Sequence, residues 1–156
     1  MRKGGKTQYH THINQIHPDD SLCIRSYGNS NEDYLNLFNN FEYLVCYDPL
    51  TFVSFIAALC GCISIVYPVD GLSKEEWIKT TCLKDYFNNN NINVVYGIAY
   101  GLDDLEWAKN TIHLVEKQMN DIIQYYEKEH LTKFLYDIDH YEEQENTVQN
   151  NYFRDE

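Results

Sequence analysis

The residues best suited to bind a ligand follow a short apolar run at residues 43–47. Asp48 and Pro49 come next, and these residue types are favoured at the N-cap and at the first position of a helix. The first amides of a helix are unpaired and lie at the positive end of its dipole, so they suit a phosphate group. Thr51 falls in the first turn and Ser54 one turn later. The sequence therefore predicts an anion site at the N-terminus of a helix that starts near Pro49.

The same residues have a simpler interpretation. Asp48 would only cap the helix, and the Ser54 hydroxyl would only donate to a carbonyl of its own helix. This is the more common role of these residue types, and both interpretations stay open. Asp48 would also repel an anion unless its carboxylate caps the helix from the side.

A basic segment at the start of the chain offers a second way to hold a phosphate. Arg2, Lys3 and Lys6 form a basic cluster in an otherwise acidic sequence, and Lys and Arg are the usual phosphate binders. The alternative is a solvated terminus. No G-x-S-x-G, G-x-G-x-x-G or P-loop motif occurs, so the sequence does not indicate a serine nucleophile or a common nucleotide-binding loop.

Metal-binding patterns are weak. His10 and His12, with His17 nearby, place two imidazoles on one face of an extended segment, but no third ligand has a fixed spacing. Asp137 and Asp139 form a D-x-D pattern inside an acidic run, where solvated charge is the expected role. We expect no bound metal and no cofactor.

A compact pattern of strand, helix and strand must position the candidate residues. Residues 43–47 are typical of a central strand, and residues 50–60 are apolar nearly all round, as in a buried helix. Gly61 is typical of a helix C-terminus. Residues 62–67 predict a second strand, which ends at Pro68. Such a βαβ unit has a right-handed crossover.

Further elements extend this unit to an α/β fold. Strands are predicted at residues 21–26 and 92–96, and helices at residues 30–40 and 73–86, where Ser30 and Ser73 begin capping boxes. We expect a Rossmann-like, mostly parallel sheet with helices on both faces, a long C-terminal helix and an acidic tail. One domain should cover residues 1–141, and residues 142–156 should be a disordered acidic tail.

The long helix, from about Asp103, carries apolar residues at alternating spacings of three and four. Such a seam usually lies along the side of its own domain. The alternative is self-association or binding of a partner helix, for which three heptads are near the minimum length. The seam consists of Leu105, Ala108, Ile112, Val115, Met119, Ile122 and Tyr126.

The composition excludes several classes of function. The 156 residues carry a net charge of −12, which argues against a protein that grips nucleic acid through its phosphates. No apolar run is long enough to span a membrane, and none follows the basic start as in a signal peptide. The five cysteines form no zinc pattern and suit free thiols in a reducing compartment. We therefore expect a cytoplasmic protein.

Residues 47–66 carry a family resemblance in the sequence YDPLTFVSFIAALCGCISIV. It resembles the nucleotide-sugar donor-binding lobe of GT-B glycosyltransferases, in a subgroup found in bacteria and giant DNA viruses. That subgroup combines a Y-D-P-x-T-x-x-S helix, an A-A-x-C-G-C turn and an S-I-V strand. Weaker similarities lie at residues 2–4, 17–18, 71–77 and 96–101. The resemblance covers about residues 2–120.

The resemblance implies a glycosyltransferase, or its donor-binding portion, that uses a nucleotide sugar such as a UDP- or GDP-sugar. Arg2, Lys3, Tyr47, Asp48, Pro49, Thr51 and Ser54 would hold the donor. Many members carry two glutamates eight positions apart, but here Asp48 and Ile56 occupy those positions. Because residues 2–4 resemble the segment that follows the family's first strand, the resemblance implies that this strand and the acceptor lobe are missing, and no catalytic residue is assigned. If viral, the protein would act in the host cytoplasm.

The missing lobe motivates an alternative function. The chain would then be a truncated, catalytically inactive remnant that keeps the fold and associates with itself or with a partner through the apolar seam. Binding of a nucleotide sugar would favour the transferase, whereas association without such binding would favour the remnant.

Overall fold

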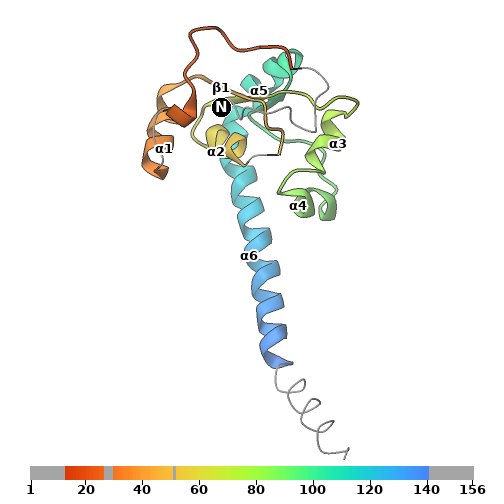
Figure 1. Ribbon diagram of the computed structural model, residues 1–156. Helices are drawn as coiled ribbons and strands as arrows, with labels where there is room; N and C mark the ends of the chain where they lie inside the picture. The colour runs from red at the N-terminus through yellow and green to blue at the C-terminus, as the bar shows by residue number, and fades with distance from the viewer. Residues whose placement is uncertain (1–12, 27–29, 51, 141–156) are drawn as a thin grey trace, which may run out of the picture. The chain divides into compact units, whose positions relative to one another are not determined.

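The computed structural model describes residues 13–26, 30–50 and 52–140 (Figure 1). The chain divides into two compact units, of which the first ends at Asn120 and the second begins at Asp121. The predicted domain boundary between residues 141 and 142 lies outside the described residues. In chain order the elements are the 3₁₀ helix η1 (Ile24–Ser26), α1 (Asn31–Asn40), β1 (Tyr43–Cys46), α2 (Val53–Leu59), β2 (Ile63–Val66), α3 (Lys74–Ile78), α4 (Lys84–Asn89), β3 (Ile98–Tyr100), η2 (Leu102–Asp104), α5 (Leu105–Thr111), η3 (Ile112–Leu114) and α6 (Val115–Asp139).

The predicted α/β fold is confirmed. The described strands form one parallel sheet in the order β1-β2-β3. Cys46 pairs with Val66, and Val66 pairs with Tyr100, so the three carboxyl ends lie side by side. Buried strands with hydrophobic side chains on both faces are typical of a parallel sheet covered by helices, and every residue of β2 is buried.

Helices cover both faces of the sheet. Leu44 of β1 packs in one cluster with Ala57 of α2 and Leu37 of α1. Ile65 of β2 packs in a second cluster with Ala108 of α5. Because successive strand residues point to opposite faces, these two clusters are the two sides of the first unit's core.

The βαβ unit at residues 43–67 is present, but its helix starts later than predicted. The sequence predicts a start near Pro49, whereas α2 begins at Val53. As expected, the helix ends before Gly61: its last residue is Leu59, Cys60 is the C-cap, and the φ of Gly61 is +85°. The amides of Gly61 and Cys62 donate to the carbonyls of Ala58 and Ala57, a bonding pattern common at helix C-termini.

The strand predicted at residues 21–26 is wrong. The 3₁₀ helix η1 occupies the end of this segment, and the Ser26 amide donates to the Cys23 carbonyl. Ile24 is buried against Leu37 and Phe38 of α1. Ile24 therefore packs against α1, and this segment is not part of the sheet.

The strand predicted at residues 92–96 is also wrong, and β3 lies at Ile98–Tyr100 instead. The Gln118 side chain replaces a neighbouring strand, because it accepts from the Tyr96 amide at 3.0 Å and donates to the Val94 carbonyl at 3.0 Å. A buried backbone needs such partners, and a side chain can supply them. The backbone of Val94 and Tyr96 is therefore held by the side-chain amide of Gln118, which lies far away in the sequence.

The helix predicted at residues 73–86 is divided into α3 and α4. The capping box at Ser73 and Glu76 is confirmed. The Thr80 and Thr81 hydroxyls donate to the Trp77 and Ile78 carbonyls at 2.7 and 2.8 Å. Threonine side chains compete in this way with the helical backbone, which explains the break.

The predicted long helix is present as α6, but the segment before it is interrupted. A 3₁₀ turn at Ile112–Leu114 separates α5 from the 25 residues of α6. Ala108, Val115 and Met119 of the predicted seam are buried in the first unit. These three side chains are packed inside the unit and are not displayed to a partner. Among the described residues, no helix is long and apolar enough to cross a membrane.

All five cysteines are free thiols. Cys46 and Cys62 are buried, and burial raises the pKa of the Cys62 thiol to about 12. Because the thiolate is the reactive form, a raised pKa and poor access both slow its reaction. Burial also raises the pKa of Cys82, but this residue stays exposed.

We expect iodoacetamide at pH 8 to label the native protein first at Cys82. Cys46 and Cys62 should stay unmodified until the protein is unfolded in denaturant. Mass spectrometry of peptides from a time course checks this order. Labelling of Cys62 at the rate of Cys82 in the folded protein would contradict the burial described above.

Candidate functional site

The predicted site residues lie partly in the loop that follows β1. Tyr47, Asp48 and Pro49 belong to this loop, at the carboxyl end of the strand, and Ser54 lies in the first turn of α2. Ligands of open α/β sheets bind at this edge. The other predicted residues, Arg2, Lys3 and Thr51, lie outside the described residues.

The predicted role of Asp48 as a helix cap is wrong. Its Oδ1 atom accepts from the Leu50 amide at 3.2 Å, which is a local turn of the kind that aspartate favours. The residue before α2 is Phe52, and it caps no amide with its side chain. The predicted anion site therefore has no helix N-terminus at Pro49, because α2 begins four positions later, at Val53.

Ser54 lies in the interior of the first unit and not at its surface. Its exposed fraction is 1 %, and its hydroxyl makes no well-formed hydrogen bond with a described residue. The hydroxyl nevertheless lies near the Cys46 thiol. Burial raises the pKa of that thiol, and the contact with Ser54 partly offsets the rise. The described geometry thus gives Ser54 a packing role.

Trp77 holds the loop that carries the predicted site. Its Nε1–H donates to the Pro49 carbonyl at 2.8 Å, and its exposed fraction is 1 %. Its ring stacks on Tyr100 of β3, with centroids 5.1 Å apart. Indole rings combine a large apolar surface with one donor. The contact therefore connects the loop after β1 to α3 and β3, a role that the local sequence did not indicate.

The carboxyl ends of β2 and β3 are connected by polar contacts. The Tyr100 hydroxyl accepts from the Val69 amide at 2.8 Å, and Lys74 pairs with Asp104 at 2.5 Å. The same Asp104 oxygen accepts from the Tyr100 amide. These contacts fix the two loops, and they occupy a lysine that would otherwise be a candidate to bind an anion.

A cluster of aromatic side chains lies at the carboxyl ends of β1 and β2. Tyr47 and Tyr67 directly follow the paired residues Cys46 and Val66, and their rings lie 5.4 Å apart. His17 packs edge-on against Tyr47. Tyr47 is one of the predicted site residues, whereas Tyr67 is not. The signal for Tyr67 was available, because the same residue type follows two neighbouring parallel strands at the same offset.

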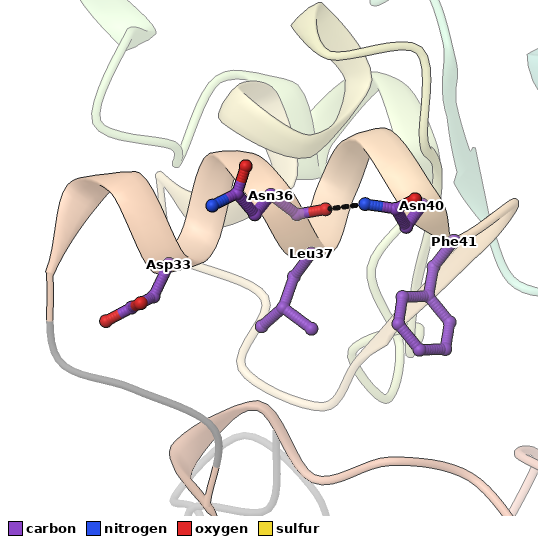
Figure 2. A pocket seen from close by; sticks show the side chains of 5 residues that line it. All are labelled: Asp33, Asn36, Leu37, Asn40 and Phe41. Carbon is purple, nitrogen blue, oxygen red and sulfur yellow. Dashed lines mark hydrogen bonds between the residues drawn. The ribbon is translucent and has the colours of Figure 1, made fainter.

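A shallow pocket of about 350 Å³ lies on α1, away from the predicted site residues (Figure 2). Figure 2 shows Asp33, Leu37 and Phe41 on one side of the helix. The side-chain amide of Asn40 donates to the backbone carbonyl of Asn36 at 2.6 Å. Asp33 is already used in the capping box of α1. No residue predicted to bind the donor lines this pocket, so it does not support the predicted site.

The part of the chain that the structure describes contains no cluster of metal-ligating side chains. Comparison of the chain with models of protein families, with curated proteins and with solved structures finds no match.

Proposed function

We propose that this chain is the nucleotide-sugar-binding portion of a glycosyltransferase. The proposal is carried by one observation: the loop with Tyr47, Asp48 and Pro49 lies at the carboxyl end of a parallel strand, beside the equivalent end of β2. This edge is where α/β sheets bind nucleotides. The resemblance of residues 47–66 to donor-binding lobes supports the same assignment.

The chemistry required of this portion is to hold the diphosphate and to stabilise negative charge as the sugar leaves. Hydrogen-bond donors directed at the departing diphosphate supply that stabilisation. Arg2, Lys3 and Thr51 are the proposed contributors, together with the loop after β1. The acceptor and the general base would belong to another part of the enzyme. Free thiols agree with a cytoplasmic location.

Calorimetric titration with a panel of UDP- and GDP-sugars tests the proposal. We expect binding of at least one nucleotide class, with the free nucleoside diphosphate retaining much of the affinity because the diphosphate carries most of the charge. A folded sample, verified by circular dichroism, that binds none of the panel would overturn the proposal.

Replacing Thr51 by valine should weaken nucleotide binding by roughly 1–2 kcal/mol, the scale of a hydrogen bond to a charged group. Valine has nearly the same shape, so the free energy of unfolding should change much less. Titration and chemical denaturation of the same sample measure the two effects. If Thr51→Val leaves the affinity unchanged and Lys3→Ala abolishes it, the basic N-terminal segment is the real diphosphate site.

A further inference from the structure

The Tyr47 hydroxyl lies at the centre of a small polar network. Its oxygen accepts from the Ile16 amide at 2.9 Å and lies 2.7 Å from Nδ1 of His17. Both contacts bridge about thirty positions of sequence, and together they hold the segment before Pro18 against the end of β1. The neighbouring Tyr67 hydroxyl accepts from the Asn14 amide at 3.1 Å in the same manner.

These contacts favour one tautomer of the histidine. A phenol oxygen that accepts an amide still has one hydrogen to donate. Among the described residues, Nδ1 of His17 is the acceptor that lies within hydrogen-bond distance of it. Donation from Tyr47 to Nδ1 satisfies the phenol hydrogen within the protein, and in that arrangement the neutral imidazole carries its own hydrogen on Nε2. In the imidazolium form both nitrogens carry hydrogen, so Nε2 is a donor in either state.

The Nε2–H group has no hydrogen-bond partner among the described residues, and the His17 side chain is partly exposed. It belongs to the network at the carboxyl end of β1, where the proposed function places the nucleotide. Lys74, the first residue of α3, is already paired with Asp104. His17 thus supplies a donor that the described residues leave unused at this edge.

We propose that His17 donates a hydrogen bond from Nε2 to an oxygen of the nucleoside diphosphate. Tyr47 is the positioning residue that fixes the imidazole tautomer and orientation. The inference rests on the proposed function and specifies a contact within that site. It also predicts a tautomer that can be measured without any ligand. A ligand atom facing Nε2 must be an acceptor, and diphosphate oxygens are strong acceptors.

Two substitutions of His17 by a side chain that ends in an amide group distinguish donation by Nε2 from a packing role. Glutamine places an amide donor about where Nε2 lies, whereas asparagine is one methylene shorter and reaches only the position of Nδ1. Titration with UDP and GDP should show an affinity about tenfold weaker for His17→Asn, and within about threefold of the wild type for His17→Gln. Equal affinity of both variants and the wild type would overturn the inference and leave the proposed function intact.

Nitrogen-15 NMR of the histidine side chains gives a second readout. In the free protein His17 should be the Nε2–H tautomer, and Tyr47→Phe should convert it to a mixture and weaken UDP or GDP binding. Tyr67→Phe is the matched control, since it removes the neighbouring hydroxyl that holds Asn14. A predominant Nδ1–H tautomer in the wild type would overturn the inference. If the wild type binds no nucleotide at all, the proposed function fails and this inference fails with it.

Discussion

Replacing Trp77 by alanine should lower the free energy of unfolding by about 3–5 kcal/mol, the usual cost of removing a buried aromatic ring. The ring is 1 % exposed and stacks on Tyr100. The substitution also leaves the Pro49 carbonyl without its donor. Chemical denaturation followed by circular dichroism measures the effect, because it does not depend on tryptophan fluorescence.

Phenylalanine at position 77 separates the contribution of the buried ring from that of the hydrogen bond to the Pro49 carbonyl. Trp77→Phe keeps much of the apolar surface but loses the donor and part of the ring, so we expect a smaller cost, of which about 1–3 kcal/mol comes from the unpaired carbonyl. Trp107→Phe is the matched control, because Trp107 is 39 % exposed and its donor bond to the Val95 carbonyl is longer, at 3.2 Å. An equal or larger loss for the control would contradict the anchoring role of Trp77. Nucleotide affinity should fall in Trp77→Phe alone.

Gly97→Ala should destabilise the protein by about 2–5 kcal/mol. The φ angle of Gly97 is +66°, which costs other residues about 1–2 kcal/mol. An added Cβ would lie 2.5 Å from Cγ2 of Val115 and 2.7 Å from Cδ1 of Ile112. Relieving such contacts in a packed core costs about another 1–3 kcal/mol. Thermal and urea denaturation of the variant would measure the sum.

Gly71→Ala is the control that separates backbone strain from crowding. Its φ angle is +76°, but an added Cβ would meet no atom within 4 Å. We expect it to cost only about 1–2 kcal/mol, since the strain of the backbone is the single term. If the two alanine variants lose equal stability, the close approach of Gly97 to Val115 and Ile112 is not a feature of the folded protein.

The elements with strong local signals were predicted from the sequence. The βαβ unit combines two apolar runs, a buried helix and a terminal glycine, and all of these signals are short-range. The Ser30 and Ser73 capping boxes are equally local, and both are confirmed. For such segments the neighbouring residues decide the conformation, so a single sequence suffices.

Two of the errors concern segments whose partners lie far away in sequence. Residues 92–96 resemble a strand, but Gln118 takes the backbone contacts that a neighbouring strand would have made. Asp48 and Pro49 have the types expected at a helix start, yet the Trp77 donor bonds the Pro49 carbonyl and the helix begins at Val53. In the sequence His17 stood out only as a neighbour of His10 and His12, because its contact with Tyr47 exists only in the folded chain.

The strands lie side by side in the order in which they occur in the chain, β1-β2-β3. This order also determines when the sheet can be completed during synthesis. Right-handed crossovers between strands added in one direction return on the same side of the sheet, and Trp77 of α3 accordingly stacks on a β3 residue that shares the face of α2. The opposite face, with Ile63, Ile65 and Ala99, is packed against Ala108 of α5, which is translated only after all three strands. A nascent chain released up to Tyr100 would expose this face to solvent. The ribosome must therefore deliver α5 before the sheet becomes a stable, non-aggregating unit.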